Sequence, residues 1–85
     1  MAKIDIYTTP FCGFCTRAKA LLTRKGTAFN EIDVMGGEAR RTMMSRAGGA
    51  HTVPQIFIGD IHVGGCSELL AMERAGQLDQ LLGLD

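Results

Sequence analysis

The chain has 85 residues, of which 46% are hydrophobic, and its nine acidic side chains balance its nine basic ones. This length favours one compact domain over residues 1–85, with a small core and no room for a second domain. The balanced charge argues against nucleic acid or an anionic membrane as a partner. No segment approaches the roughly 20 apolar residues that cross a bilayer, and the N-terminus has no secretory signal. We therefore expect a cytoplasmic protein.

The first half of the chain has the hydrophobic pattern of a strand, a helix and a second strand. Residues 3–8 alternate apolar with polar side chains, which predicts a half-buried strand. Residues 13–25 are mostly helix formers, and Gly26 follows as a helix terminator. Residues 28–34 predict a second strand, which is parallel to the first because a helix connects the two.

The second half adds a helix, a hairpin and a last helix. The pattern predicts a helix over 38–47 and two short strands over 55–58 and 61–63, close enough to form a hairpin. The remaining residues are amphipathic and predict a helix in which Gly76 is a candidate break. The predicted order is βαβαββα, which belongs to the α/β class.

Cys12 and Cys15 stand where the first strand gives way to the first helix. A spacing of three residues brings both sulfurs within one helical turn, close enough for a disulfide. Unpaired amides and the helix dipole at a helix start stabilise a thiolate, so Cys12 is the predicted nucleophile. Cys15 lies one turn further in, where neighbouring side chains shield it, and is predicted to resolve a mixed disulfide. Arg17 and Lys19 either assist electrostatically or are simply solvated.

The main alternative for the cysteine pair is half of a zinc site, whose other ligands would come from Cys66, His51 and His62. Those three residues form no second closely spaced pair, and the strand-turn-helix context favours redox chemistry. An odd number of cysteines also fits poorly with the disulfide framework of a small secreted protein.

Thr52-Val53-Pro54 immediately precedes the predicted strand over 55–58. A cis bond before Pro54 would turn the Val53 backbone outward, where an extended peptide could pair with it. The alternative is an ordinary trans proline at the start of an edge strand, which the base rates of X-Pro bonds favour.

A glycine turn, Gly64-Gly65, leads through Cys66-Ser67-Glu68 into the last helix. Glycines let a ligand approach closely, and the free amides of a helix start can bind a carboxylate, with the Ser67 hydroxyl as a cap or donor. The alternative is a capped helix without a ligand. Cys66 fits a small buried side chain better than a third redox thiol.

In order and spacing, these segments resemble the glutaredoxins over nearly the whole chain. The resemblance is carried by Tyr7-Thr8, Cys12-Gly13-Phe14-Cys15, Thr52-Val53-Pro54-Gln55-Ile56-Phe57 and Gly64-Gly65-Cys66-Ser67-Glu68-Leu69. It implies the thioredoxin-like fold of a small bacterial-type member, with a central four-stranded mixed sheet flanked by helices and a cis bond before Pro54. It also implies glutathione as the reducing partner.

The resemblance implies site roles for the residues that match by position. Glutathione would be held by two groups of residues: Thr52, Val53 and Pro54 on its cysteinyl part, and Gly65, Cys66, Ser67 and Glu68 on its γ-glutamyl end. Arg41 would meet the glycyl carboxylate or is a solvated helix residue. Tyr7 and Phe14 would flank the site or only pack.

Two departures from the family pattern have functional meaning. Thr9, beside the site, replaces a lysine that in many members helps to bind the glycyl carboxylate and to stabilise the thiolate. Arg41 would then provide the positive charge at the site in place of that lysine. Gly13-Phe14 replaces the Pro-Tyr of many dithiol members. In the family, a small residue in place of that Pro, which is Gly13 here, is associated with glutathione-ligated [2Fe-2S] clusters that bridge two subunits.

The predicted function is glutathione-dependent reduction of protein–glutathione mixed disulfides, and of protein disulfides such as that of ribonucleotide reductase. We expect the enzyme to be a monomer and to need no metal. The rival is a binding module in which Cys12 from two chains and two glutathiones hold a [2Fe-2S] cluster. A thioredoxin fits less well, because that family resembles Trp-Cys-Gly-Pro-Cys at the site, whereas this chain has Phe11 and Gly13-Phe14.

Overall fold

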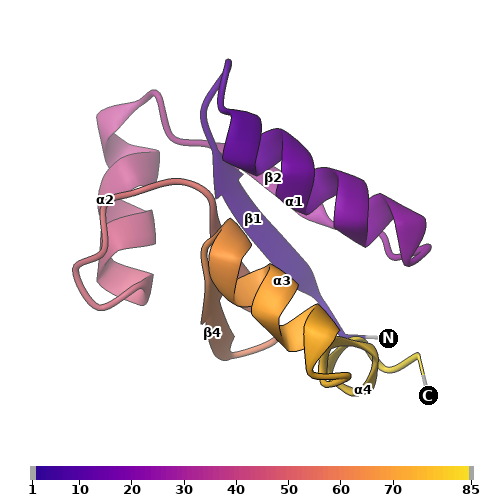
Figure 1. Cartoon of the computed structure of the whole chain (residues 1–85). Helices are drawn as coiled ribbons and strands as arrows, with labels where there is room; N and C mark the ends of the chain where they lie inside the picture. Colours follow the sequence, from indigo (N-terminus) through magenta and orange to yellow (C-terminus); the bar gives the residue numbers. More distant parts are fainter. Residues whose placement is uncertain (1, 85) are drawn as a thin grey trace.

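The computed structural model describes residues 2–84, and its elements follow the predicted order (Figure 1). They are β1 (Ile4–Thr8), α1 (Gly13–Arg24), β2 (Asn30–Asp33), α2 (Gly37–Arg46), β3 (Gln55–Ile58), β4 (Ile61–Gly64), α3 (Cys66–Arg74) and α4 (Leu78–Leu82). The predicted last helix is in two pieces, because α3 ends before Gly76, whose φ is 74°, and α4 begins after it. No helix within residues 2–84 has the length and apolar character needed to span a membrane.

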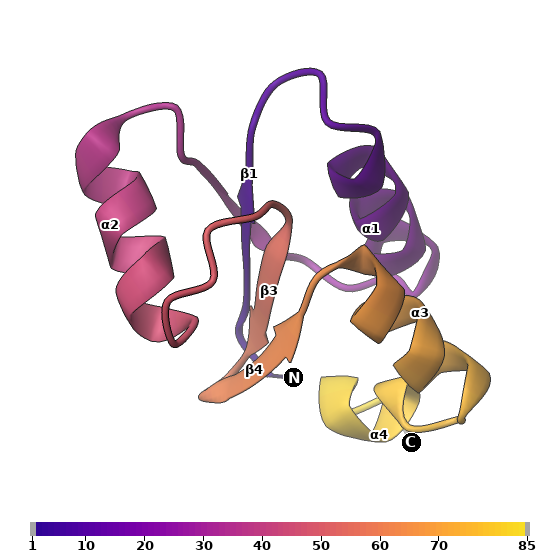
Figure 2. The ribbon, with the colours of Figure 1, turned by 60° about the vertical axis from the view of Figure 1, so that its left-hand side comes forward.

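The strands form one four-stranded mixed sheet in the order β2-β1-β3-β4. β1 is parallel to β2 and antiparallel to β3, and β3 and β4 form the predicted hairpin. Helices α1 and α3 cover one face of the sheet, and α2 covers the other (Figure 2). β1 is an inner strand of the sheet, and α1 follows it directly in the chain. The start of α1 therefore lies at the carboxyl end of β1.

The prediction that the first strand is half-buried is wrong. All five residues of β1 are buried, because β1 has a strand on each side and helices over both faces. Its polar side chains are paired: Asp5 accepts a hydrogen bond from Arg46 Nη1 at 3.0 Å, and Thr8 donates one to Glu31 Oε2 at 2.8 Å. The alternation of apolar and polar residues in β1 therefore does not separate a buried face from an exposed one. Both faces are buried, and they differ in polarity.

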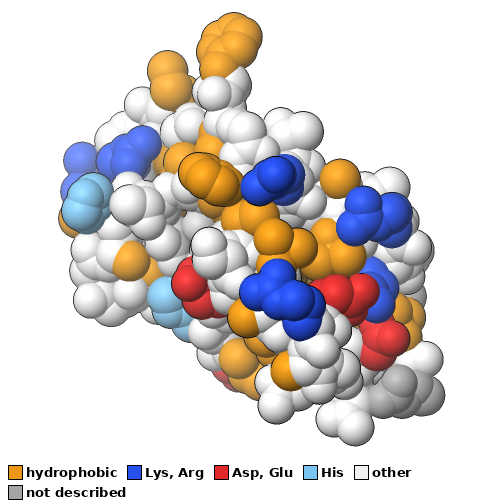
Figure 3. All heavy atoms as spheres, in the orientation of Figure 1, with side chains coloured by type: hydrophobic (Ala, Val, Ile, Leu, Met, Phe, Trp, Pro, Cys, Tyr) orange, Lys and Arg blue, Asp and Glu red, His pale blue; other side chains and the backbone are white. Residues whose placement is uncertain are grey.

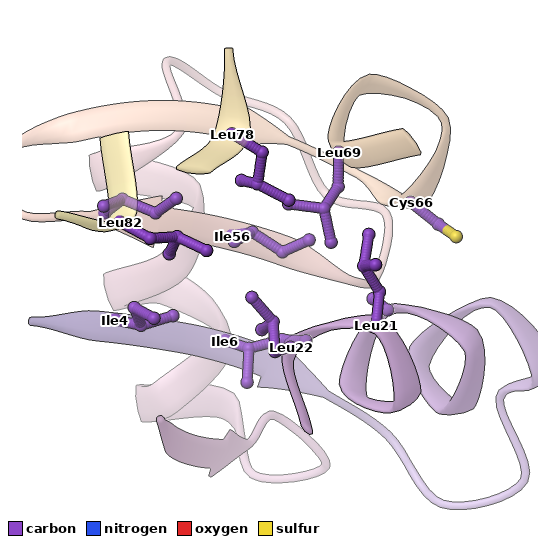
Figure 4. Close-up of a cluster of buried hydrophobic side chains, with 11 residues drawn as sticks. Ile4, Ile6, Leu21, Leu22, Ile56, Cys66, Leu69, Leu78 and Leu82 are labelled. Atoms are coloured by element: carbon purple, nitrogen blue, oxygen red, sulfur yellow. The ribbon is translucent and has the colours of Figure 1, made fainter. Parts of the chain in front are cut away.

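A hydrophobic cluster fills the space on each face of the sheet. The larger cluster lies between the sheet and helices α1, α3 and α4 (Figure 4) and contains Ile4, Ile6, Ala18, Leu21, Leu22, Ile56, Ile58, Cys66, Leu69, Leu78 and Leu82. The smaller cluster, under α2, contains Tyr7, Val34, Met43, Ala47 and Phe57. Cys66 is 4% exposed and belongs to the larger cluster, as expected of a small buried side chain.

Lys25, the residue that follows α1, connects three helices. Its Nζ lies 2.7 Å from a carboxylate oxygen of Asp79 on α4 and 2.7 Å from one of Glu73 on α3. Asp79 and Glu73, in that order, raise the pKa of Lys25 above its ordinary value. The C-terminal helices are thereby attached to one end of α1, whose other end carries the cysteine pair.

Leu22 is fully buried in the larger cluster. We expect Leu22→Ala to lower the free energy of unfolding by about 2–5 kcal/mol, through lost burial and the cavity that the substitution leaves. Leu84 is 39% exposed and provides the matched control, since Leu84→Ala should change this free energy by less than about 0.5 kcal/mol. Urea denaturation of both variants measures the difference, and equal losses would contradict the packing described here.

Candidate active site

Cys12 is the N-cap residue of α1. Its backbone is extended, with φ −102° and ψ 109°, and its Sγ accepts a hydrogen bond from the Cys15 N–H at 3.1 Å. This bond satisfies one of the amides that a helix start leaves without a partner, and it strengthens when the sulfur is negative. The side chain of Cys12 is only half-buried, so a substrate can reach the sulfur that this hydrogen bond holds at the start of α1.

Cys15 lies in the first turn of α1 and is 2% exposed. Burial raises the pKa of its thiol from 9.0 to about 11, with a further contribution from Cys12 and opposing ones from the Thr9 backbone and the Lys19 charge. Cys15 is therefore protonated at neutral pH. The accessibility of the two thiols differs in the direction that the predicted roles of nucleophile and resolving residue require.

Exposed aromatic residues stand beside Cys12 in the chain. Phe11 is fully exposed and has a φ of 62°, a left-handed conformation that is unusual for a bulky residue. Phe14 is 59% exposed. Figure 3 shows hydrophobic side chains projecting from the end of the molecule at which α1 begins. The turn from β1 into α1 thus leaves apolar surface next to the accessible thiol.

A hollow of about 160 Å³ lies between the segment before β3 and the start of α3. The bond between Val53 and Pro54 is cis, as the family resemblance implies and in contrast to the trans alternative. The Val53 carbonyl oxygen lies 4.0 Å from Cys12 Sγ, which places the hollow next to this thiol. This cis-proline hollow is lined by Phe14, Thr52, Val53, Pro54, Gly65, Cys66, Ser67 and Glu68.

Two predicted site residues, Arg41 and Tyr7, do not line the cis-proline hollow. Arg41 is exposed on α2 and does not line the cis-proline hollow. Tyr7 is 4% exposed under α2, where its ring meets Phe57 edge-on at 5.8 Å and its hydroxyl accepts a hydrogen bond from Arg46 at 2.9 Å. Tyr7 therefore packs in the smaller cluster, which is the alternative to a position flanking Cys12.

A second hollow, of about 370 Å³, opens on the β2 side of the cysteine pair. Its lining residues are Thr8, Thr9, Pro10, Phe11, Cys12, Cys15, Thr16, Lys19, Glu31 and Asp33. Glu31 Oε2 lies 2.8 Å from Lys19 Nζ and accepts a hydrogen bond from Thr8, and these partners lower the pKa of Glu31. Sequence patterns did not point to Glu31, because only the register of β1 with β2 brings it to the site.

The zinc alternative has no third ligand in the part of the chain that the structure describes. Within residues 2–84, no group of three or more His, Cys, Asp and Glu side chains is arranged to hold a metal ion. His62 contacts Gln55 instead, and Cys66 belongs to the larger hydrophobic cluster.

Comparison with known proteins shows which family this chain belongs to. The family model described as glutaredoxin matches residues 4–63. The chain belongs to the glutaredoxin family. A glutaredoxin of Pseudomonas aeruginosa is 54% identical over 82 residues, which cover 96% of this chain and 98% of that protein. Membership of the glutaredoxin family makes the chain a thiol–disulfide oxidoreductase.

Solved glutaredoxin structures share the fold. The solution structure of glutaredoxin from Brucella melitensis matches with a TM-score of 0.85 and 54% identity, over 99% of this chain and 91% of that one. The crystal structure of a buckwheat glutaredoxin–glutathione complex matches with a TM-score of 0.86 and 27% identity, over 96% of this chain and 77% of that one. The predicted thioredoxin-like fold is thereby confirmed.

The burial of Cys15 predicts how this thiol reacts. In a Cys12→Ser, Cys66→Ser double variant, Cys15 is the remaining thiol, and it should resist iodoacetamide at neutral pH and react only in alkaline solution, because burial raises its pKa and the thiolate is the reactive form. Mass spectrometry of the alkylated protein over a pH series measures the rate. Rapid alkylation at neutral pH would contradict the buried, protonated state of Cys15.

Proposed function

We propose that this member of the glutaredoxin family uses glutathione to reduce mixed disulfides between proteins and glutathione, and reduces protein disulfides as a second class of substrate. The observation that carries the proposal is the cis-proline hollow, whose Val53 carbonyl oxygen lies 4.0 Å from Cys12 Sγ. A tripeptide bound there would present its sulfur to Cys12. The buckwheat relative was crystallised as a glutaredoxin–glutathione complex, which supports glutathione as the ligand.

The first catalytic route, reduction of a mixed disulfide between a protein and glutathione, needs only Cys12 of the two active-site thiols. The Cys12 thiolate attacks the glutathionyl sulfur of the substrate, and the protein thiolate leaves and takes up a proton. A second glutathione, as its thiolate, attacks the same glutathionyl sulfur, which produces glutathione disulfide and returns Cys12 as a thiolate. The hydrogen bond from the Cys15 N–H stabilises Cys12 both as the attacking and as the leaving sulfur.

Cys15 provides the second route. When Cys12 carries a protein partner, Cys15 attacks the Cys12 sulfur, its proton passes to the departing thiolate, and a Cys12–Cys15 disulfide forms. Disulfides without a glutathionyl group, such as that of ribonucleotide reductase, require this route. Burial raises the pKa of the Cys15 thiol, which slows this attack at neutral pH and leaves time for glutathione to resolve the first intermediate.

The two walls of the cis-proline hollow suit the two ends of glutathione. Val53 provides backbone for strand-like pairing with the cysteinyl residue. The amides of Cys66 and Ser67 belong to the first turn of α3, where they have no partner within the helix and suit the γ-glutamyl carboxylate. Glu68 accepts a hydrogen bond from the Gly65 N–H at 2.7 Å, and its fixed carboxylate suits the neighbouring ammonium group of the ligand.

Residues at the rim and outside the hollow complete the proposed site. Phe14 lines the hollow and is 59% exposed, so its ring can cover the bound tripeptide. Arg41 provides an exposed cation for the glycyl carboxylate, since Thr9 provides none. The three cysteines are free thiols, which suits the reducing cytoplasm as the place of action, and we propose a monomer as the active form.

Gly13 supports a second candidate function. A Cβ built on Gly13 meets nothing within 4 Å, so the backbone beside Cys12 is open to a large ligand. A [2Fe-2S] cluster held by the Cys12 thiolates of two chains and by two glutathiones would use this opening, and bound there it would supply iron and sulfur for storage or delivery. Visible absorbance after anaerobic reconstitution, compared between the unmodified protein and Cys12→Ser, distinguishes this function from reduction alone.

Substitution of each active-site cysteine separates the two routes. With glutathione, glutathione reductase and NADPH, the protein should turn over a glutathionylated peptide rapidly. Cys12→Ser should abolish the activity because it removes the nucleophile, whereas Cys15→Ser should retain it because glutathione resolves the intermediate. Steady-state NADPH consumption measures all three proteins. Equal loss in both variants would contradict the first route, and negligible turnover by the unmodified protein would contradict the proposed function.

A further inference from the structure

Gln55 is a buried polar residue that the proposed mechanism does not use. It is the first residue of β3 and is 4% exposed. Its Nε2 donates hydrogen bonds to the Thr52 carbonyl oxygen at 3.0 Å and to Thr52 Oγ1 at 3.2 Å. Its Oε1 lies 2.7 Å from Nε2 of His62 on β4. Gln55 thus connects one wall of the cis-proline hollow to the edge strand of the sheet.

The chemistry of these partners fixes the direction of each hydrogen bond. A carbonyl oxygen only accepts, so the amide nitrogen of Gln55 must face Thr52 and its amide oxygen must face His62. Nε2 of His62 therefore carries a hydrogen, either in the neutral Nε2–H tautomer or in the imidazolium. Both of these forms donate from Nε2, so the contact holds the Gln55 amide in one orientation.

The ring of His62 is itself held in place, although the residue is exposed. It stacks on Phe57, with ring centroids 4.8 Å apart and an angle of 20° between the planes. The guanidinium carbon of Arg46 lies 4.0 Å from the centroid of the Phe57 ring, and Arg46 also bonds Asp5 on the central strand. A continuous series of contacts thus leads from the sheet through His62 to Gln55.

We propose that Gln55, oriented by His62, is a positioning residue that fixes Thr52 and Val53 for the glutathionyl group of the substrate. The inference rests on the proposed function, because it takes the cis-proline hollow as the site of glutathione. Thr52 is exposed in that hollow, and Gln55 makes both of the side-chain hydrogen bonds that hold Thr52 within residues 2–84. Without them, the ligand must order this segment as it binds, and its affinity falls.

The test compares Gln55→Met, which keeps the length of the side chain but removes the amide, with Gln80→Met on α4 as the matched control. For Gln55→Met we expect a rise of about three- to tenfold in KM for the glutathionylated peptide, the effect of one or two lost hydrogen bonds. The Kd of S-methylglutathione, a probe without a free thiol, should rise by the same factor. The kcat and the alkylation rate of Cys12 should not change.

A pair of substitutions at His62 provides an independent test that does not depend on how well Gln55→Met folds. His62→Phe keeps the stacking on Phe57 but removes the donor, so it should raise the Kd of S-methylglutathione. His62→Gln restores a donor and should bring the Kd back toward that of the unmodified protein. Thermal unfolding of each variant separates these effects from a general loss of stability.

An unchanged KM and Kd in folded Gln55→Met would overturn the positioning role. A loss of stability and kcat without a rise in KM would also overturn it, because that is the result of a purely structural role. If the unmodified protein bound S-methylglutathione but did not turn over the peptide, the proposed function would fail, while the Kd values of the variants would still decide the role of Gln55.

Discussion

The hydrogen bond from the Cys15 N–H to Cys12 Sγ is the interaction on which the rest of the site depends. It requires α1 to begin immediately after Cys12, and the chain meets this requirement by ending β1 at Thr8 and turning at Phe11 with a φ of 62°. Because β1 is a central strand paired with β3, its carboxyl end lies beside the segment that enters β3. The strand order therefore brings Cys12 within 4.0 Å of the Val53 carbonyl.

The two thiols at the start of α1 have opposite environments. Cys12 receives an amide hydrogen bond and faces solvent, whereas Cys15 is covered by the core and keeps its proton, with a pKa of about 11. A hydrogen bond to sulfur is stronger when the sulfur is a thiolate, and the disulfide has no thiolate to accept one. One local structure thus influences the order of attack and the ease of reduction together.

Local patterns predicted most of the fold, and long-range contacts account for what they missed. The helix over 13–24 and the hairpin over 55–64 follow from periodicity and turn residues within each segment. The full burial of β1 depends on the helices on both of its faces, which no local pattern contains. The position of Tyr7 depends on Arg46, a distant residue on α2 that its hydroxyl bonds.

The features of the site also divide into those that local sequence patterns predict and those that depend on long-range contacts. The cysteine pair is local, and its position at a helix start was evident from the residues themselves. The remainder of the cis-proline hollow combines segments around Thr52 and Ser67, which only the family resemblance could join before the structure was known. Glu31 and the contact between Gln55 and His62 depend on strand register, which the sequence encodes only through packing. Arg41 matched the family by position, yet α2 holds it outside the hollow.

The most direct test of the central claim is to locate glutathione on the protein. In the Cys15→Ser variant, the mixed disulfide between Cys12 and glutathione should accumulate, and intermolecular distances measured by NMR can place the tripeptide. We predict contacts to Thr52, Val53 and Ser67 in the cis-proline hollow. Contacts to Lys19 and Glu31 in the hollow on the β2 side would contradict the assignment of the cis-proline hollow as the glutathione site.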